Sequence, residues 1–219
     1  MLLLLAACGG QPTAEPEPTT RPLSPSPTSS APSPSATASA SASASASASA
    51  SPTRRPTEKA DPRWRFFEED RTRYSSPWFE GQRRVMIGYG CTPAPYYDPD
   101  PTCPGGQGFH HGIDVAMPCG TPLFSAVDGV VVDPLSSGSP GPAYGVRSFR
   151  IRTGSLDVLV GHARRVFVEP GDPVRRGQRI ALASDSAASS DGCHLHFEVR
   201  RQGGGVSHAI DPAELLQLS

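Results

Sequence analysis

The segment that most constrains the fold of this chain is the run from His194 to Arg200, in which polar and apolar side chains alternate. In an extended strand, residues two apart point the same way, so His194, His196 and Glu198 share one face while apolar residues occupy the other. In a helix the two histidines would point about 200° apart. The pattern therefore predicts a strand with a polar face for chemistry and an apolar face for a core.

A second histidine-bearing stretch lies at residues 110–114 and needs a bend. A straight strand would separate His110 from Asp114 by about 13 Å. A single metal ion with bonds of about 2 Å cannot reach both across that span. Gly112 tolerates a sharp bend or a positive φ, so we expect His110 at the end of a loop and a strand over 113–115.

Together the two stretches predict a zinc site. Three protein ligands with a position left open favour a catalytic site, because structural zinc is usually closed by four. A lone histidine is more often a surface or hydrogen-bonded core residue, which is our interpretation of His111 and His208. His110 with Asp114 alone would be a weak signal, and the pair on the later strand carries the prediction.

Between residues 81 and 215 the chain carries further motifs built on glycine, histidine and aspartate. They read His110-x-Gly112-x-Asp114, Gly120-Thr121-Pro122-Leu123, Ala126-x-Asp128-Gly129-Val130-Val131, Gly161-His162, Gly171-Asp172-x-Val174-x-x-Gly177-Gln178 and His194-Leu195-His196-Phe197-Glu198-Val199. In these motifs the chain resembles the lysostaphin-like (LytM-type) zinc metalloendopeptidases, which cut peptidoglycan peptides.

The resemblance implies a ligand set and two catalytic residues. The zinc ligands fall on His110, Asp114 and His196, with water in the fourth place, and the two further active-site histidines fall on His162 and His194. Zinc lowers the pKa of its water toward 7 and polarises the peptide carbonyl. His194 would accept the proton of the water, and His162 would bind the oxyanion or share proton transfer to the leaving amine. Which of the two is the general base stays open.

The expected fold is mainly β: a single antiparallel sheet or sandwich-like metallopeptidase domain over 81–219. A short closing helix is predicted at Asp211-Pro212-Ala213-Glu214, which has an acceptor followed by proline. Residues 63–80 hold both tryptophans and are interpreted as an amino-terminal extension packed on the sheet, with a helical start over 63–72. Strands are expected near 84–88, 113–116, 122–125, 129–133, 147–152, 156–161, 166–168, 179–183 and 194–200.

Four cysteines in the domain region are typical of an oxidising compartment. If the two metal-bearing strands run antiparallel, Cys119 and Cys193 lie off the same end of the pair, which makes them a disulfide candidate and leaves Cys91 with Cys103. Four cysteines allow three pairings, and the sequence alone does not choose among them. Free buried thiols are the alternative.

The amino-terminal region predicts export and attachment. Residues 1–8 resemble a lipoprotein signal, without a basic start and with a short apolar run, and Cys8 is the candidate lipidation site. A chance match or a plain cleaved signal are the alternatives. Residues 9–62 consist mainly of Ser, Ala, Pro and Thr and are interpreted as a disordered linker, because such a composition cannot bury a core. The membrane would be a partner through the lipid.

A formal net charge of -1 gives no electrostatic sign of nucleic-acid binding. Five arginines gather over 164–179, and a solvated face explains them better than an acidic polymer. The sequence thus predicts an extracytoplasmic, lipid-anchored zinc endopeptidase of the bacterial cell envelope, acting on peptidoglycan stems or cross-bridges. The alternatives are a non-catalytic wall-binding or hydrolase-activating module and a structural metal-binding surface protein. Dependence on a protein activator stays open.

Overall fold

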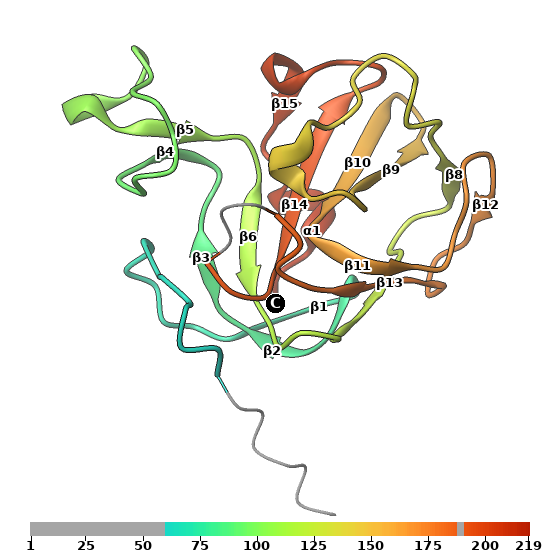
Figure 1. Ribbon diagram of the computed structural model, residues 1–219, viewed down its shortest axis with the longest axis horizontal. Coiled ribbons are helices and arrows are strands. Elements are labelled where there is room, and N and C mark those ends of the chain that lie inside the picture. Colours follow the sequence, from blue (N-terminus) through green and yellow to red (C-terminus); the bar gives the residue numbers. More distant parts are fainter. Residues whose placement is uncertain (1–59, 188–190) are drawn as a thin grey trace, which may run out of the picture. The chain divides into compact units, whose positions relative to one another are not determined.

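The computed structural model describes residues 60–187 and 191–219, and both ranges consist mostly of short strands joined by turns (Figure 1). The strands are β1 (Tyr74–Ser76), β2 (Phe79–Arg83), β3 (Val85–Ile87), β4 (Gly90–Thr92), β5 (Gly108–His110), β6 (Ile113–Ala116), β7 (Pro122–Phe124), β8 (Gly129–Val131), β9 (Phe149–Thr153), β10 (Leu156–Gly161), β11 (Ala163–Val166), β12 (Pro173–Val174), β13 (Arg179–Ala183), β14 (His194–Arg201) and β15 (Ala209–Ile210). The helical elements are three 3-10 turns, η1 (Pro104–Gly106), η2 (Pro142–Tyr144) and η3 (Val206–His208), and one α-helix, α1 (Ala213–Leu216).

The strands form three sheets, and every strand pair within the described residues is antiparallel. The largest has the order β12-β8-β9-β10-β14-β6-β3, with β15 added beside β14. A five-stranded sheet has the order β1-β2-β7-β13-β11, and β4 pairs with β5 in a separate lobe at the upper left of Figure 1. The mainly β, antiparallel architecture expected from the sequence is confirmed.

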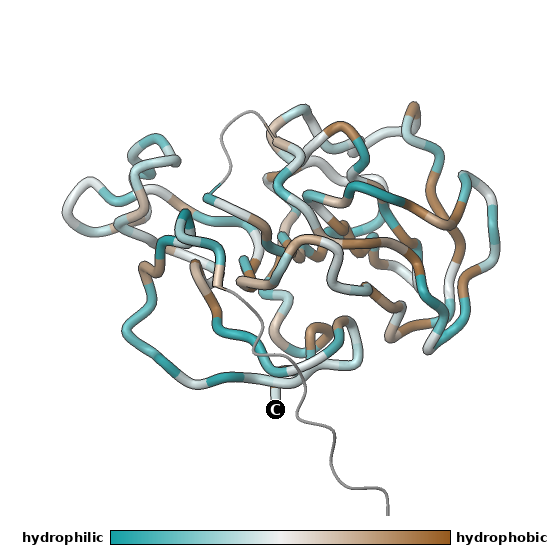
Figure 2. Tube along the Cα trace, turned by 60° about the horizontal axis from the view of Figure 1, so that its bottom comes forward, coloured by the Kyte–Doolittle hydropathy of each residue, from teal (hydrophilic) through white to brown (hydrophobic). Residues whose placement is uncertain are grey.

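The core lies between the two larger sheets and is anchored by the apolar face of β14. Leu195, Phe197 and Val199 alternate along that strand and are at most 1% exposed. Trp78 packs edge-on against Phe197, with 4.7 Å between the ring centroids. Figure 2 shows the same division, with brown hydrophobic stretches through the middle of the trace and mostly teal or white loops at its periphery. The apolar face of the predicted strand therefore forms part of the core, as the alternation in the sequence predicted.

The segment before β1 is the clearest departure from expectation, because the predicted helical start over 63–72 is wrong. The structure describes no helix there. The Trp64 indole donates to the carbonyl of Cys193 at 2.6 Å, and the Phe67 amide donates to the carbonyl of Met86 at 2.8 Å. Contacts with residues far along the chain thus fix this segment in an irregular conformation and override its local preference.

The remaining predictions of secondary structure mostly hold. β6, β10 and β13 have the predicted bounds, and α1 follows Asp211, whose carboxylate accepts a hydrogen bond from the Ala213 amide at 2.9 Å. The strand predicted at 166–168 is instead β11, three residues earlier. Among the described residues, no helix is both long and apolar enough to cross a membrane.

Candidate metal centre

The two histidine-bearing stretches meet because β6 and β14 are neighbours in the largest sheet. Their register pairs Asp114 directly with His196. The polar face of β14 is also buried, since His194 is 5% exposed and His196 is 7% exposed. The expected antiparallel strand pair therefore places a carboxylate and an imidazole side by side in the interior.

Two glycines let the backbone approach the His196 ring. A Cβ atom on Gly112 would lie 2.7 Å from Cε1 of His196, and one on Gly161 would lie 2.9 Å from its Cβ. Neither glycine has a positive φ. The sequence argument was therefore right that Gly112 is needed, but the reason is close approach and not an unusual backbone angle. The bend that it permits carries the chain from His110, the last residue of β5, into β6.

Three donor atoms converge at the resulting junction. Nδ1 of His196 lies 2.8 Å from Oδ1 of Asp114 and 3.2 Å from Nε2 of His110, and the His110 and Asp114 atoms are 3.5 Å apart. In tetrahedral coordination with bonds of about 2.0–2.1 Å, two ligand atoms lie about 3.3 Å apart. The donor set therefore fits a zinc ion in both chemistry and spacing.

The outer nitrogens of both histidines are held by hydrogen bonds that select the required tautomers. Nδ1 of His110 lies 2.9 Å from the carbonyl of Gly88, and Nε2 of His196 lies 3.2 Å from a carboxylate oxygen of Glu198. Each outer nitrogen carries the proton, because its partner can only accept. The inner nitrogens face the Asp114 carboxylate, and each can offer a lone pair there once a metal ion takes the place of a proton.

The charges at the junction are strongly coupled. Burial alone would raise the pKa of Asp114, but the adjacent imidazoles of His110, His194 and His196 hold it well below its usual range. For His196 burial lowers the pKa, and the carboxylates of Asp114 and Glu198 more than offset this and raise it to about 9. The protein therefore concentrates negative charge where a cation would bind.

The two further histidines lie next to this cluster. The rings of His162 and His194 are 4.2 Å apart, and Nε2 of His194 is 3.9 Å from Oδ1 of Asp114. Nδ1 of His194 lies 2.9 Å from the carbonyl of Gly192 and donates to it, so its Nε2 is left as an acceptor. The structure thus brings together all five histidine and aspartate residues that the sequence singled out for the site.

His162 is held in an unusual conformation. Its φ is 53°, in the left-handed region that non-glycine residues rarely adopt. The strain is held from both sides, since its amide donates to the carbonyl of Tyr144 at 2.8 Å and its carbonyl accepts from the Ser184 hydroxyl at 2.7 Å. Burial, together with the neighbouring imidazoles of His194 and His196, lowers the pKa of His162 to about 3, so its ring is neutral at pH 7.

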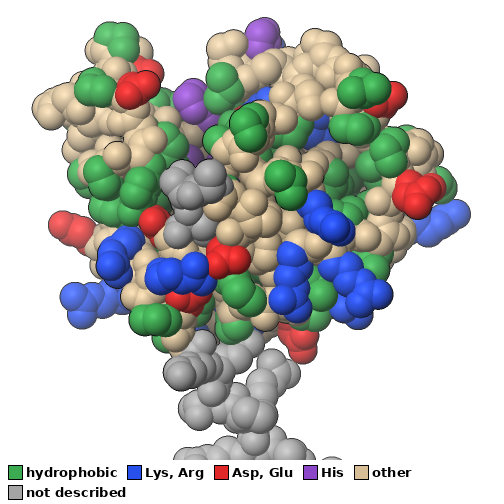
Figure 3. Space-filling view, viewed as in Figure 1, with side chains coloured by type: hydrophobic (Ala, Val, Ile, Leu, Met, Phe, Trp, Pro, Cys, Tyr) green, Lys and Arg blue, Asp and Glu red, His purple; other side chains and the backbone are tan. Residues whose placement is uncertain are grey.

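A cleft of about 240 Å³ opens over the cluster. In Figure 3 purple histidine side chains show in the hollow beside the lobe that carries β4 and β5. Sequence reasoning missed most of the residues that line the cleft, and one of them is His111, which it interpreted as a surface or hydrogen-bonded core residue. Besides the five cluster residues, the cleft is lined by Ile87, Tyr96, Tyr97, His111, Ala143, Tyr144 and Asp191.

The aromatic walls sit directly against the cluster. The Tyr97 ring is 5.2 Å from the His110 ring, and the Tyr144 ring meets the His196 ring edge-on at 5.1 Å. Burial raises the pKa of both tyrosines, so their hydroxyls stay protonated at neutral pH. Neither residue belongs to a local motif, and only the folded arrangement of their loops brings them to the cleft.

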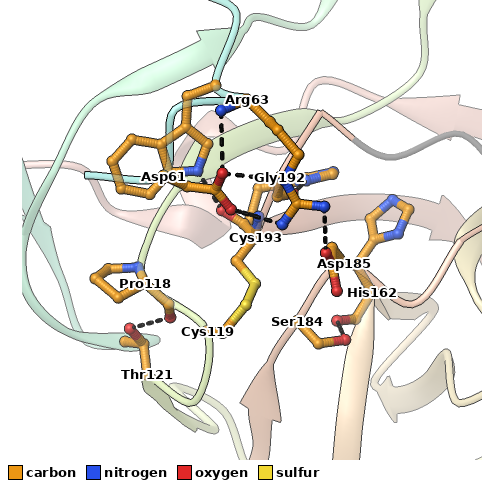
Figure 4. Close-up of a disulfide and its surroundings, with 12 residues drawn as sticks. Asp61, Arg63, Pro118, Cys119, Thr121, His162, Ser184, Asp185, Gly192 and Cys193 are labelled. Carbon is orange, nitrogen blue, oxygen red and sulfur yellow. Dashed lines mark hydrogen bonds and ion pairs between the residues drawn. A yellow bond between two sulfur atoms is a disulfide. The ribbon is translucent and has the colours of Figure 1, made fainter. Parts of the chain in front are cut away.

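Both predicted disulfides are present, and one of them borders the site. Cys91 is bonded to Cys103, and Cys119 is bonded to Cys193, the residue before His194. Figure 4 shows Asp61 and Arg63 from the amino-terminal segment over this bond. The Asp61 carboxylate accepts from the Cys193 amide at 3.2 Å, and Arg63 pairs with Asp185 at 2.7 Å. The start of the described chain is therefore fastened beside the active-site strand.

Other residues that the sequence singled out lie elsewhere. Cys8 falls outside the described residues, as does most of the linker predicted at 9–62. His208 is exposed in η3 and does not line the cleft, which agrees with its assignment to the surface. The five arginines between 164 and 179 are all exposed and lie on β11, directly after β12 and at the start of β13.

Comparison with known proteins matches this region to a described family. Residues 108–212 match the model of "Peptidase family M23". The peptidoglycan DD-endopeptidase ShyA of Vibrio cholerae is 35% identical over 99 residues, which are 45% of this chain and 22% of that protein. The lipoprotein NlpD/LppB homolog of Pseudomonas aeruginosa is 35% identical over 105 residues, 48% of this chain and 32% of that protein. The chain therefore spans no more than about a third of the length of these two relatives.

The catalytic domain of lysostaphin from Staphylococcus simulans aligns with a TM-score of 0.48 and 24% identity, covering 62% of this chain and 92% of that one. The matched family region contains all five residues of the cluster, from His110 to His196. The resemblance inferred from the sequence is confirmed, and this chain carries a domain of peptidase family M23.

Proposed function

We propose that this domain is a zinc-dependent endopeptidase that hydrolyses peptide bonds in the stems or cross-bridges of peptidoglycan. The observation that carries the proposal is the convergence of His110 Nε2, Asp114 Oδ1 and His196 Nδ1 within 3.5 Å of one another, with two further histidines beside them. The substrate class is supported by the relative named as a peptidoglycan DD-endopeptidase.

The ligand triad supplies one half of the chemistry. A zinc ion held by these three atoms would polarise the peptide carbonyl and make water acidic enough to attack at neutral pH. The negative charge of Asp114 would attract the cation, whose binding displaces the proton that His196 holds on its inner nitrogen in the metal-free protein. The protein therefore prepares the site before substrate arrives.

His194 is the general base in this proposal. Its Nδ1 is occupied by the carbonyl of Gly192 at 2.9 Å, so the proton of the attacking water has only Nε2 to go to. That atom faces the ligand cluster, 3.9 Å from Oδ1 of Asp114. After attack, the imidazolium of His194 is placed to return the proton to the leaving amine.

His162 takes the complementary role. A neutral imidazole always carries one N–H donor, and the low pKa of His162 keeps it neutral through the working pH range. The buried Nδ1 has no hydrogen-bond partner among the described residues. We assign His162 to stabilising the oxyanion of the tetrahedral intermediate, for which a fixed, uncharged donor is well suited.

The envelope location follows from the substrate and from the cysteines. Two disulfides in a domain of this kind are typical of proteins outside the reducing cytoplasm. We propose that the domain works extracytoplasmically and that Cys8, through a lipid, ties it to a membrane. The parent chain should incorporate labelled fatty acid and the Cys8→Ser variant should not, which tests the anchor independently of the enzyme activity.

The decisive experiment is digestion of purified peptidoglycan by the purified chain, with and without a zinc chelator, followed by mass analysis of the fragments. The enzyme predicts new amino and carboxyl ends within peptides, no cut glycan, and loss of activity with chelator that added zinc restores. A wall-binding module predicts sedimentation with peptidoglycan without fragments. A structural metal protein predicts bound zinc without fragments.

Matched variants separate a loss of the chemistry of the cluster from a general loss of folding. His194→Ala should keep zinc and lose fragments, whereas His208→Ala, which removes an exposed histidine outside the cleft, should change neither. Fragments that form equally with chelator present, or a purified chain free of zinc, would refute the proposal.

A further inference from the structure

The polar face of β14 continues beyond the metal ligand into a buried pair of opposite charges. Glu198 is 0% exposed and Arg200 is 2% exposed. Taking charges out of water is costly, and they persist in an interior only when each is paired and hydrogen-bonded. No step of the proposed reaction uses either residue, so their burial needs another explanation.

Their hydrogen bonds form an unbroken chain that starts at the metal ligand. One oxygen of Glu198 lies 3.2 Å from Nε2 of His196, and the other accepts from Nε of Arg200. The remaining nitrogens of Arg200 donate to the carbonyl of Gly138 at 3.1 Å and to the hydroxyl of Tyr144 at 3.0 Å. Arg200 thereby joins the strand of the ligand to the loop between β8 and β9.

Tyr144 closes the chain on the opposite wall of the cleft. Its ring contacts the His196 ring edge-on, and its carbonyl accepts the amide of His162, the residue with the strained φ. Tyr144 thus accepts a hydrogen bond from Arg200 at its hydroxyl and a hydrogen bond from the His162 amide at its carbonyl. The ligand side and the His162 side of the cleft are connected through it.

We infer that Glu198 is a positioning residue for the metal ligand His196, and that Arg200 and Tyr144 carry this positioning to the wall that holds His162. The inference rests on the proposed zinc site. A carboxylate on the outer nitrogen of a ligating histidine fixes its tautomer and ring orientation and increases the basicity of the inner nitrogen. Arg200 holds Glu198 in place, because it donates to the carboxylate oxygen that His196 does not contact.

The same sheet offers a matched control. Asp157 on β10 is 0% exposed and pairs with Arg150 and Arg152 at 3.3 and 2.8 Å. It lies opposite Arg200 in the strand register, and Arg150 binds the same loop through the carbonyl of Ser137 at 2.7 Å. Like the Glu198 pair, this cluster joins a fully buried carboxylate to a buried arginine, but it makes no contact with His196 among the described residues.

The test measures zinc affinity by competition with a chromophoric chelator, on the purified full chain. Glu198→Gln keeps the shape of the side chain and removes its charge, and should weaken zinc binding about 10- to 100-fold. Asp157→Asn should leave zinc affinity within about threefold of the parent, although it also removes the anion of a buried arginine, Arg150. The cobalt-substituted protein should show a shifted visible spectrum for Glu198→Gln and an unchanged one for Asp157→Asn.

A double variant separates positioning from stability. Glu198→Gln leaves Arg200 buried without its anion and should lower the melting temperature, whereas adding Arg200→Met removes that unpaired charge and should restore it. Zinc affinity should stay low in the double variant, because the carboxylate on His196 is still missing. A purely structural role predicts instead that zinc affinity recovers together with the melting temperature.

Tyr144→Phe tests the far end of the chain, since it deletes only the hydroxyl that Arg200 binds. Zinc affinity should fall less than in Glu198→Gln. The kcat should fall with KM unchanged, because Arg200 no longer fixes the tyrosine loop whose carbonyl holds the His162 amide.

The outcomes separate the inference from the proposed function. A parent chain that binds no zinc overturns both. A parent chain that binds zinc, with Glu198→Gln matching it in affinity and cobalt spectrum, overturns this inference alone.

Discussion

The domain holds two buried polar clusters, centred on β10 and β6, the two strands that flank β14, and they are built in opposite ways. Both carboxylate oxygens of Asp157 accept hydrogen bonds. Arg152 donates to both, at 2.8 and 3.0 Å, and the Gly203 amide and Arg150 donate as well. Around Asp114 one carboxylate faces three imidazoles, and the neighbouring His162 leaves a buried nitrogen without a partner in the described chain.

The difference teaches how to tell a structural polar cluster from a functional one. A fully bonded network stabilises one conformation and has no bonding capacity left for a ligand. A crowded cluster with converging donor atoms is costly in the free protein and becomes satisfied only when a cation and a substrate bind. Variants of the first cluster should therefore affect folding, and variants of the second should affect chemistry.

The largest effect is expected for His196→Ala. Removing a ligand from a three-residue set should abolish zinc binding and lower kcat/KM at least about 1,000-fold, because the ion supplies several kcal/mol of transition-state stabilisation. Zinc content of the purified variant and fragment release from peptidoglycan check this. Its metal-free melting temperature should drop less than that of Asp157→Asn, and the reverse order would break the comparison.

The next largest effect is expected for His194→Ala. Losing a general base costs about 100- to 10,000-fold in kcat, while the ligand triad is left whole. Parallel measurement of zinc stoichiometry and cleavage rate checks the separation. If the variant cleaves at the parental rate, His194 is not the base; if it loses its zinc, His194 is a ligand.

Asp157→Asn should cost about 3–5 kcal/mol of unfolding free energy at pH 7, because it leaves the buried Arg150 without its anion, whereas the partly exposed Arg152 can turn to solvent. Burial would raise the pKa of Asp157, but the hydrogen bonds from Arg152 and Gly203 and the nearby guanidinium charges lower it. The stability it contributes is therefore fully present above about pH 4, the ordinary aspartate pKa, and is lost as the pH falls through the lowered value.

Urea unfolding of the parent and Asp157→Asn as a function of pH checks the sign, since the gap between them should narrow in acid. Cleavage by the fraction that stays folded should match the parent. A gap that widens in acid would contradict the pairing described for Asp157.

The smallest effect is expected for Ser184→Ala, at the edge of the functional cluster. The Ser184 hydroxyl donates to the carbonyl of His162, so its loss should cost about 1 kcal/mol of stability. Cleavage should fall less than about tenfold, because the Tyr144 carbonyl still holds the His162 amide. A variant with parental kcat would show that this hydrogen bond is not needed to keep the unusual φ of His162.

Much of the site could be predicted because its signals are local. The alternation along β14 gives both the strand and its polar face, and an adjacent strand carrying Asp114 follows from the need to bring a carboxylate to that face. Both disulfides also agree with the sequence prediction, since antiparallel pairing of β6 and β14 brings Cys119 beside Cys193.

What could not be predicted depends on contacts made across the fold. Tyr144 reaches the cleft because a long loop is tied down by Arg150 and Arg200, and nothing around residue 144 in the sequence indicates this. Strands such as β12 and β15 are two residues long, too short to show a period. The helix expected over 63–72 fails because the Trp64 hydrogen bond to Cys193 governs that segment, not its composition.

β14 contributes one face to the core and the other to the candidate metal centre, and this restricts which changes of sequence the domain tolerates. Lengthening the strand by one residue between His194 and Phe197 would exchange its two sides, sending histidine into the core and the phenylalanine ring toward the substrate. A substitution on this strand changes one side chain, whereas an insertion or a deletion moves every residue beyond it to the other face. Changes in chain length should therefore be confined to the loops between strands, and the spacing from Cys193 to Arg200 should stay fixed.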